Sequence, residues 1–264
     1  MLLCLKHGVK LTVRLSKKVI LVTGSSSGIG EGIARKCAAE GASVMVHGKG
    51  EVESTAISQS ILQIGGESSP VFGDLSDPAV PARLVAETIE CYGRLDGLVN
   101  CAGISTRASL ESVSPEIFDH LMAVNARAPM LAIQAAWPHF KAQGRGAVLN
   151  IGSVCAYRGP AHLVPYSMTK AALANLTITL AGAFAKDGLR INQLNVGWTL
   201  TDNEYQLGLE DGMGENWPVK LQEHSMPFGR MLLPEDIAEA AVYLLSDAAT
   251  MLSGSVIAFS PGPW

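Results

Sequence analysis

Short apolar runs alternate with longer stretches of helical spacing along most of this 264-residue chain. The runs are almost continuously hydrophobic, as strands are when both faces of a sheet are covered. Between them, apolar residues recur every three or four positions, which is typical of helices packed on such a sheet. The apolar runs predict strands at 19–23, 43–47, 70–73, 96–100, 147–151, 190–195 and 255–259. The patterns between them predict helices near 28–40, 51–64, 78–92, 115–140, 165–187 and 234–246.

Residue types at the ends of these segments agree with the alternation. Asp77 followed by Pro78 is typical of a helix N-cap with proline at the first helical position. Gly41 and Gly188 stand where helices should end. No linker, repeat or low-complexity tract divides the chain. We therefore predict an α/β fold with a parallel sheet, formed by one domain over residues 17–264. Residues 1–16 are expected to form a short N-terminal extension, to which we assign no function.

Residues 197–227 show no clear periodicity. They contain Trp198, Tyr205 and Trp217 together with several glycines. A loop of this length in a compact domain is usually functional or disordered, and the aromatic residues argue against disorder. We interpret the segment as a lid over a pocket. A peripheral subdomain packed on its neighbour is the alternative.

Composition narrows the choice of partners. Charged residues make up 17% of the chain, against a norm of about 25%, so part of the surface is expected to be covered, most simply by self-association. The net charge is −4 and no lysine- or arginine-rich run exists, so we expect no nucleic-acid partner. No apolar run reaches the roughly 18 residues of a membrane span, so we expect no membrane segment. Residues 1–18 mix charges with apolar residues and lack a small-residue cleavage site, so they make a poor secretion signal.

The five cysteines are scattered and form no CxxC pair, and the six histidines do not cluster at ligand spacing. We therefore expect no metal site and no disulfide framework, and we predict a cytoplasmic, reducing location.

A glycine- and serine-rich turn joins the first predicted strand to the first predicted helix, in the sequence VTGSSSGIGEGI over residues 22–33. A helix N-terminus offers unpaired N–H groups and a partial positive charge, which suit a pyrophosphate. Glycines let a ligand approach the backbone and permit positive φ. The spacing GxxxGxG differs from the common GxGxxG fingerprint, and no P-loop lysine follows. The turn is therefore either a phosphate site or a plain tight turn.

The second predicted strand ends in VMVHGKG, without the acidic residue that would bind a ribose 2′-hydroxyl. Gly48 and Lys49 occupy that place. Because a lysine could meet a 2′-phosphate, the pattern favours NADP over NAD, with NAD still possible. A solvated turn lysine is the alternative.

Tyr166 and Lys170 lie four residues apart, on one face of the predicted helix 165–187. The ordinary pKa of tyrosine, about 10, is too high for a general base at neutral pH. An ammonium about 4 Å away, at an effective dielectric near 20, favours the phenolate by up to about 4 kcal/mol, or about 3 pKa units. We therefore expect Lys170 to lower the pKa of Tyr166, and bound NAD(P)⁺ would add a second positive charge. A surface pair is the alternative.

Two further polar residues lie where chemistry is expected. Ser153 follows the strand 147–151, at the edge where a doubly wound sheet opens its ligand crevice. Asn125 lies inside the helical pattern 115–140, where an asparagine usually needs a partner. Each has a structural alternative, a turn cap for Ser153 and a satisfied core amide for Asn125. Their occurrence together with Tyr166 and Lys170 after a glycine turn favours a catalytic group.

In this order the motifs resemble those of the short-chain dehydrogenases/reductases in their single-domain form, and the resemblance runs from about residue 17 to 260. The matching motifs are Thr23-Gly24-Ser25-Ser26-Ser27-Gly28-Ile29-Gly30, Asp74-Leu75, Asn100-Cys101-Ala102-Gly103, Asn125, Ser153, Tyr166-x-x-x-Lys170, Asn195-Val196-Gly197 and residues 227–247. Any one of them is weak evidence, whereas the ordered series is specific.

The resemblance implies a Rossmann-like, doubly wound, seven-stranded parallel sheet with helices on both faces, and hydride exchange between a nicotinamide and a secondary alcohol or carbonyl. It implies that Tyr166 is the acid/base, that Lys170 lowers its pKa and holds the nicotinamide ribose, and that Ser153 orients the substrate oxygen. Asn125 would fix a water that relays protons toward Lys170. The implied cofactor-binding residues, besides Tyr166 and Lys170, are Gly24, Ser26, Ser27, Gly28, Ile29, Gly30, Lys49, Asp74, Leu75, Asn100, Ala102, Gly103, Gly197, Thr199 and Thr201. The family also implies a homotetramer, with contacts through helices 115–140 and 165–187.

Three positions depart from the family pattern. Cys101 replaces a second asparagine, Val196 replaces a proline, and Ser260-Pro261-Gly262 replaces an acidic Asp-Gly-Gly at a tail that meets a neighbouring subunit in the family. The second departure weakens the assignment of Thr199 and Thr201.

The leading interpretation is an NAD(P)-dependent dehydrogenase or reductase of a small alcohol or carbonyl. A 3-oxoacyl-carrier-protein-type reductase is one alternative, although the acidic composition provides no basic docking surface. A non-catalytic cofactor-binding regulator is another, although all four expected catalytic residues are present. Polar residues in 197–227 favour a sugar or polyol as substrate, namely Asp202, Asn203, Glu204, Glu210, Asp211 and Asn216.

Overall fold

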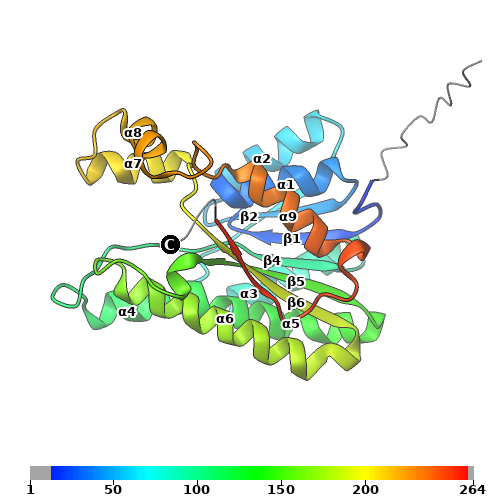
Figure 1. Ribbon diagram of the computed structural model, residues 1–264. Coiled ribbons are helices and arrows are strands. Elements are labelled where there is room, and N and C mark those ends of the chain that lie inside the picture. The colour runs from blue at the N-terminus through cyan, green and yellow to red at the C-terminus, as the bar shows by residue number, and fades with distance from the viewer. Residues whose placement is uncertain (1–12, 261–264) are drawn as a thin grey trace, which may run out of the picture.

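Seven parallel strands form one sheet with helices on both faces (Figure 1). The computed structural model describes residues 13–260, without the side chains of residues 223–225. The strand order is β3-β2-β1-β4-β5-β6-β7, and all neighbouring strands pair in parallel. The strands are β1 (Val19–Thr23), β2 (Ser43–Gly48), β3 (Glu67–Phe72), β4 (Gly97–Asn100), β5 (Gly146–Ser153), β6 (Leu189–Val196) and β7 (Val256–Phe259). The order changes direction between β1 and β4, where doubly wound sheets bind ligands. The predicted fold class is confirmed.

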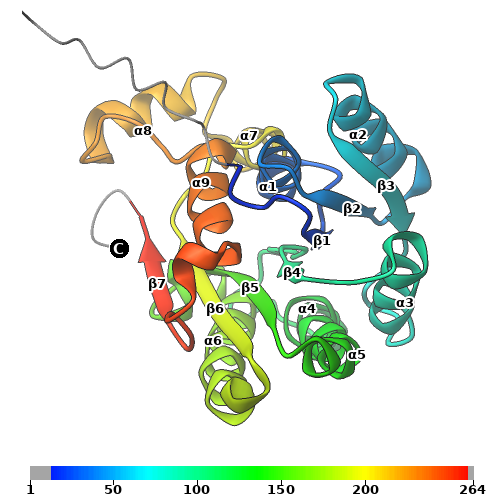
Figure 2. The same cartoon turned by 90° about the vertical axis from the view of Figure 1, so that its right-hand side faces the viewer.

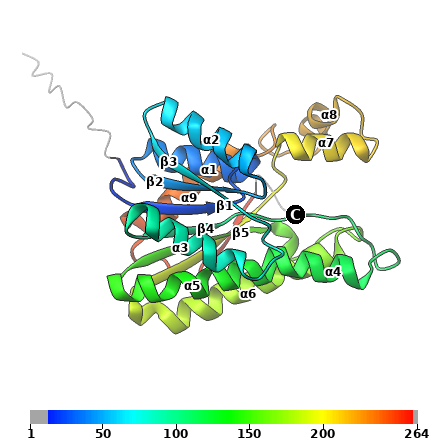
Figure 3. The ribbon, with the colours of Figure 1, turned by 180° about the vertical axis from the view of Figure 1, so that it is seen from behind.

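Two helical layers cover the sheet, and Figure 2 shows them on opposite faces. The first layer holds α1, α2 and α9, and the second holds α3, α4, α5 and α6. Figure 3 shows α4, α5 and α6 of the second layer from behind. The helices of the first layer are α1 (Gly28–Ala39), α2 (Glu51–Gln63) and α9 (Pro234–Leu245). Those of the second layer are α3 (Val80–Tyr92), α4 (Pro115–Met122), α5 (Ala128–Gln143) and α6 (Val164–Phe184).

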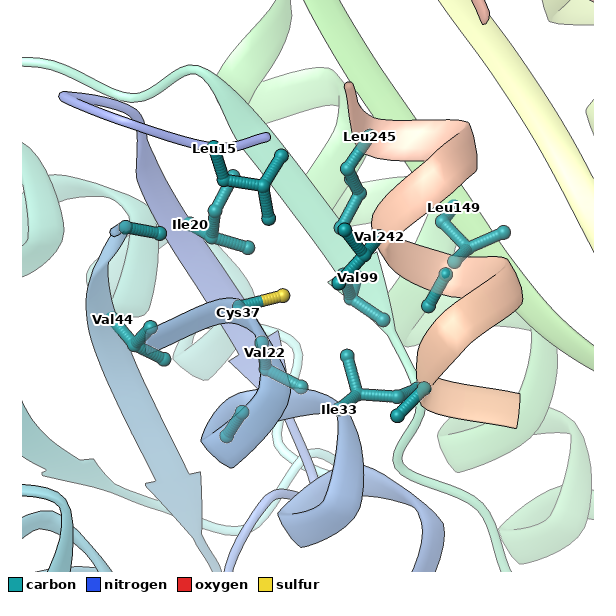
Figure 4. Close-up of a cluster of buried hydrophobic side chains, with 14 of the residues drawn as sticks. Leu15, Ile20, Val22, Ile33, Cys37, Val44, Val99, Leu149, Val242 and Leu245 are labelled. Atoms are coloured by element: carbon teal, nitrogen blue, oxygen red, sulfur yellow. The ribbon is translucent and has the colours of Figure 1, made fainter. Parts of the chain in front are cut away.

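Apolar side chains fill the space between the sheet and the first helical layer (Figure 4). Ile20 and Val22 of β1 pack there with Ile33 of α1 and Val242 of α9, all fully buried. Leu15 joins the same cluster and is also fully buried. The described part of the predicted N-terminal extension, residues 13–16, therefore packs onto the domain. Residues 1–12 lie outside the described part of the chain.

Two predicted boundaries were wrong for local reasons. The third strand begins at Glu67 rather than residue 70, because this edge strand alternates exposed and buried residues instead of forming a continuous apolar run. Helix α3 begins at Val80, with Ala79 as its N-cap. Asp77 accepts a hydrogen bond from the Ala79 N–H at 2.8 Å and so caps the preceding turn. Gly41 and Gly188 do follow helix ends, with φ of +85° and +76°.

The segment 197–227 contains two helices, α7 (Asp202–Glu210) and α8 (Trp217–Ser225), which project past the carboxyl edge of the sheet (Figure 1). Trp217 is only 2% exposed and stacks on Trp198 and Tyr205, with ring centres 5.6 and 6.4 Å apart. A side chain at Gly208 would collide with the Trp217 indole, so the glycine makes this packing possible. Within residues 13–260, no helix combines the length and apolar character needed to cross a lipid bilayer.

Candidate active site

A cavity of about 800 Å³ opens at the carboxyl ends of the strands, where the strand order changes direction. It extends from the turn after β1 to the first turns of α6 and to one side of α7. Most of the predicted cofactor residues line it, together with both members of the predicted tyrosine–lysine pair. These lining residues are Gly24, Ser26, Ser27, Gly28, Ile29, Gly30, Lys49, Asp74, Leu75, Ala102, Gly103, Tyr166, Lys170 and Thr201.

The glycine turn is both tight and open to the cavity. Gly24 has φ +66°, and a Cβ there would lie 2.6 Å from the Ala102 Cα, so no larger residue fits. A Cβ on Gly30 would collide with the Gly24 carbonyl, which fixes how closely α1 approaches the turn. The N-terminus of α1, at Gly28, faces the cavity and provides unpaired N–H groups.

The three serines of the turn divide into two roles. Ser25 is fully buried, donates to the Val22 carbonyl at 2.7 Å and accepts from the His47 N–H at 2.9 Å. It therefore holds the turn together and provides no donor to the cavity. Ser26 and Ser27 line the cavity.

Lys49 places an ammonium directly after β2, and the position of Gly48 has no room for an acidic side chain. A Cβ on Gly48 would lie 2.9 Å from the Ser26 Cβ, so the glycine lets the turn approach β2. The Lys49 ammonium lies 2.8 Å from a carboxylate oxygen of Asp74 across the mouth of the cavity. The Lys49 ammonium, followed by Ser76, holds the pKa of the Asp74 carboxyl well below its usual range.

Three predicted cofactor residues do not line the cavity. The Asn100 side chain is buried and donates to Asn150 at 2.8 Å, which in turn donates to Thr177 at 2.8 Å. This amide therefore ties β4 to β5 and α6. Gly197 and Thr199 lie just behind the cavity, where the Thr199 hydroxyl donates to the Gly197 carbonyl at 3.0 Å.

The continuous helix predicted over 115–140 is interrupted at Asn125. A π-helical turn, η1 (Ala123–Arg127), separates α4 from α5 and contains this residue. Asn125 is fully buried, accepts from the Ile104 N–H at 2.9 Å, and donates to the Ile104 carbonyl and the Thr169 hydroxyl at 2.8 and 3.1 Å. Such turns recur at functional sites, and this one ties the loop after β4 to α6.

Tyr166 and Lys170 lie in the first turns of α6 and face the cavity together. The Lys170 Nζ lies 5.7 Å from the centre of the Tyr166 ring and donates to the Ile151 carbonyl at 3.0 Å. Burial lowers the pKa of Lys170 to about 8. Burial raises the pKa of Tyr166 above its usual value, and a hydrogen bond with the Ser153 side chain acts in the opposite direction.

The Tyr166 pKa is therefore raised overall, and the expected net lowering was wrong. The residue spacing placed the ammonium near the phenol correctly, but it did not reveal how strongly burial disfavours both charged forms. Ser153 is 7% exposed and is the last residue of β5, directly before the short 3-10 turn η2 (Val154–Ala156), where its hydroxyl also accepts from the Cys155 N–H at 3.1 Å.

Sequence reasoning did not identify several polar residues that line the same cavity. His47 and Arg107 are two of them, and Arg107 forms an ion pair with Asp211 at the end of α7. His47 had a visible signal, since a histidine in an otherwise apolar strand end needs polar partners. Arg107 had none, because its partner lies more than a hundred residues away in the chain. Among the described residues, no group of three histidine, cysteine or acidic side chains could hold a metal ion.

Known proteins match this chain over nearly its full length. It is 34% identical over 245 residues to an uncharacterized oxidoreductase of Thermotoga maritima, covering 93% of this chain and 96% of that protein. It is 32% identical to the L-rhamnose 1-dehydrogenase (NAD(P)(+)) of Azotobacter vinelandii, with 94% and 97% covered. The solved structure of L-sorbose reductase from Gluconobacter frateurii, complexed with NADPH and L-sorbose, superposes with a TM-score of 0.90 at 29% identity, covering 96% of this chain and 98% of that chain.

A family model described as enoyl-(acyl carrier protein) reductase matches residues 24–262, from the glycine turn to the end of the last strand and beyond. The match thus includes every segment that lines the cavity. The family model and the relatives match nearly the whole chain, and the sheet has the doubly wound strand order. The chain therefore belongs to the short-chain dehydrogenases/reductases.

Proposed function

We propose that this protein transfers a hydride between NADP(H) and a secondary alcohol or carbonyl group of a sugar or polyol, with Tyr166 exchanging the proton. The observation that carries the proposal is the single cavity in which the glycine turn, Lys49, Tyr166 and Lys170 meet. The turn fits a dinucleotide because its glycines let the backbone pack tightly at the edge of the cavity and because a helix N-terminus faces the cavity.

The cofactor supplies the hydride, and the chain supplies proton transfer and positioning. Because burial raises the pKa of Tyr166, its phenol keeps its proton at neutral pH and can donate it to a carbonyl oxygen during reduction. The product is an alcohol, formed from one hydride and one proton. In oxidation the phenolate form of Tyr166 accepts the proton of the alcohol and becomes the phenol, and the Lys170 ammonium, 5.7 Å from the ring centre, stabilises that phenolate beforehand.

Two further residues support this geometry. The Ser153 hydroxyl shares a hydrogen bond with Tyr166, which supports a role for Ser153 in binding the substrate oxygen. Asn125 holds Ile104 and Thr169 in place on either side of the site, which supports a positioning role. A water-relay role for Asn125 remains part of the proposal. Both of its amide atoms already have protein partners, so such a water would share them.

A preference for NADP over NAD is supported by charge. Lys49 places an ammonium at the end of β2, and the space at Gly48 excludes the acidic side chain that would bind a free 2′-hydroxyl. Lys49 is paired with Asp74, and a 2′-phosphate would offer it a second, doubly charged partner.

The substrate end of the cavity supports a polyhydroxylated substrate. Its lining includes the polar side chains of Ser105, Thr106, Arg107, His120, Asn203 and Glu210. Related proteins act on rhamnose and sorbose by name. A long acyl chain would instead need an apolar channel, so we favour the sugar or polyol over a carrier-protein substrate.

The segment 197–227 is proposed as a lid. Helix α7 has cavities on two sides: Asn203, Leu207 and Glu210 line the active-site cavity, and Asp202 and Tyr205 line a second cavity of about 580 Å³. A helix bordered by open space on both sides has room to move toward the substrate.

We further propose a cytoplasmic homotetramer. Exposed apolar residues on α5 and α6, namely Met130, Met168 and Ile178, support contacts through these helices. The four cysteines among the described residues are free thiols, which supports a reducing compartment. The predicted tail contact at Pro261-Gly262 lies outside the described residues.

The test is a panel of sugars, polyols and ketones assayed with NADP(H) and NAD(H) side by side, read as absorbance at 340 nm. We expect turnover of at least one polyol or ketose, with a lower KM for the phosphorylated cofactor. Binding of NADPH without turnover on any substrate would favour the non-catalytic alternative. Absence of NADPH binding would overturn the proposal.

A further inference from the structure

His47 is a buried, titratable side chain that the proposed chemistry does not use. It lies near the end of β2, two residues before Lys49, and is only 2% exposed. Both ring nitrogens have backbone partners. The Gly24 N–H donates to Nδ1 at 3.0 Å, and Nε2 lies 3.1 Å from the Gly73 carbonyl oxygen.

These two partners determine the tautomer. A backbone N–H can only donate, so Nδ1 must carry the lone pair and the ring proton must be on Nε2, which donates to the Gly73 carbonyl. Burial lowers the pKa of His47 to about 4, which keeps the ring neutral. The imidazole is thus fixed in one protonation state with one donor and one acceptor.

The two backbone groups belong to different parts of the proposed cofactor site. Gly24 opens the turn that faces the diphosphate, and Gly73 directly precedes Asp74, the partner of Lys49. The main chain reinforces both links: the Ser25 N–H donates to the His47 carbonyl at 2.8 Å, and the Gly73 N–H donates to the Gly48 carbonyl at 3.0 Å. The imidazole ring contacts both loops, through Nδ1 to Gly24 and through Nε2 to Gly73.

We propose that His47 is a positioning residue that fixes the spacing between the diphosphate turn and the loop that binds the adenosine end of the cofactor. The cofactor then meets one preformed site instead of two loops that must be ordered on binding. This inference rests on the proposed function, namely that the cavity binds NADP(H).

Two substitutions separate the two contacts. In H47N, the side-chain oxygen takes the place of Nδ1 and can accept from the Gly24 N–H, but the side chain is too short for the Gly73 carbonyl. In H47Q, the terminal amide nitrogen takes the place of Nε2 and can donate to Gly73, while the acceptor for Gly24 is lost. The matched control is S68A, which removes a buried hydrogen bond between Ser68 of the neighbouring strand β3 and Ser58 of α2, neither of which lines the cavity.

The experiment measures the NADPH dissociation constant by fluorescence, the KM for NADPH and kcat, and the inhibition constant of 2′-AMP, which covers only the adenosine end. Each lost hydrogen bond is expected to weaken NADPH binding by about tenfold, in H47N and in H47Q alike, with kcat at saturating NADPH unchanged. Inhibition by 2′-AMP should weaken in H47N and stay at the wild-type value in H47Q. The control S68A should leave all three quantities unchanged.

NADPH binding within twofold of wild type in both variants would overturn the inference, as would a loss of kcat at unchanged KM. Failure of both variants to fold, judged by circular dichroism, would assign the imidazole to folding alone and also overturn it. Failure of the wild-type protein to bind NADPH would instead overturn the proposed function, so the two outcomes are distinguishable.

Discussion

Replacement of Lys170 with methionine is expected to abolish turnover while changing the pH dependence of stability in a defined way. The ammonium is 4% exposed, and its burial lowers the Lys170 pKa from 10.5 to about 8. At 1.36 kcal/mol per pKa unit, keeping this charge inside the folded protein costs about 3 kcal/mol at neutral pH. Methionine is of similar length and removes that cost, but it leaves the Ile151 carbonyl without its donor, at a cost of about 1–3 kcal/mol. K170M should therefore fold with nearly wild-type stability at pH 7.

The sign of the pH effect follows from proton binding. Below pH 8 the lysine is protonated in both the folded and the unfolded chain, so the cost is fully present. Between pH 8 and 10.5 the folded protein loses the proton while the unfolded chain keeps it, so wild-type stability rises with pH relative to K170M. The difference in unfolding free energy, wild type minus K170M, should increase by about 2 kcal/mol from pH 7 to pH 9.5.

The assay is urea unfolding followed by fluorescence at fixed protein concentration, at pH 7, 8, 9 and 9.5. Taking the difference between variants cancels the titration of all other groups. The control variant K186M replaces an exposed lysine just after α6 and is measured at the same pH values. A K170M difference that stays constant with pH would refute the account of a buried, costly ammonium.

Two other variants test the cofactor and lid assignments. K49A should raise the KM for NADPH at least tenfold and leave the KM for NADH within twofold, because only the phosphorylated cofactor gains from the ammonium; equal changes for both cofactors would contradict the 2′-phosphate assignment. W217A removes a side chain that is 2% exposed and stacks on Trp198 and Tyr205, and such losses cost about 3–5 kcal/mol. Because this packing lies within 197–227, hydrogen exchange should increase in α7 and α8 but not in the sheet; uniform acceleration across the sheet would show that the segment is part of the global core.

Most of the sheet could be predicted from the sequence because its inner strands are buried on both faces. β5 and β6 are buried along nearly their whole length, and their apolar runs are correspondingly continuous. The edge strand β3 alternates and contains Pro70, so its apolar signal covered only its second half. Hydrophobic periodicity does not specify strand order, and the doubly wound arrangement of the sheet was implied only by the family resemblance.

The remaining features depended on contacts that periodicity does not encode. The π-helical turn at Asn125 is only five residues long and lies between two helices, so the hydrophobic pattern did not reveal it. Helices α7 and α8 are short and largely polar, and they are held by the burial of Trp217 against Gly208 and Trp198. The raised pKa of Tyr166 reflects burial, which residue spacing alone does not predict.

The clustering of the candidate catalytic residues could be predicted from the sequence because their spacing is local. Tyr166 and Lys170 share one helix face, and Ser153 ends the strand beside them. The cofactor side was predicted less completely. The Asn100 side chain donates its hydrogen bond to Asn150 and not to the cavity. His47 connects two loops through contacts with backbone groups, which no sequence motif specifies.

The central claim is that Tyr166 exchanges the proton while the rest of the site binds the cofactor. The most direct measurement compares wild type and Y166F in parallel, with NADPH binding followed by fluorescence and turnover by absorbance at 340 nm on a substrate accepted by the wild type. We predict that Y166F binds NADPH within about threefold of wild type and loses at least a thousandfold in kcat, since the phenyl ring keeps the packing and lacks the proton. Turnover of Y166F within tenfold of wild type would contradict the account.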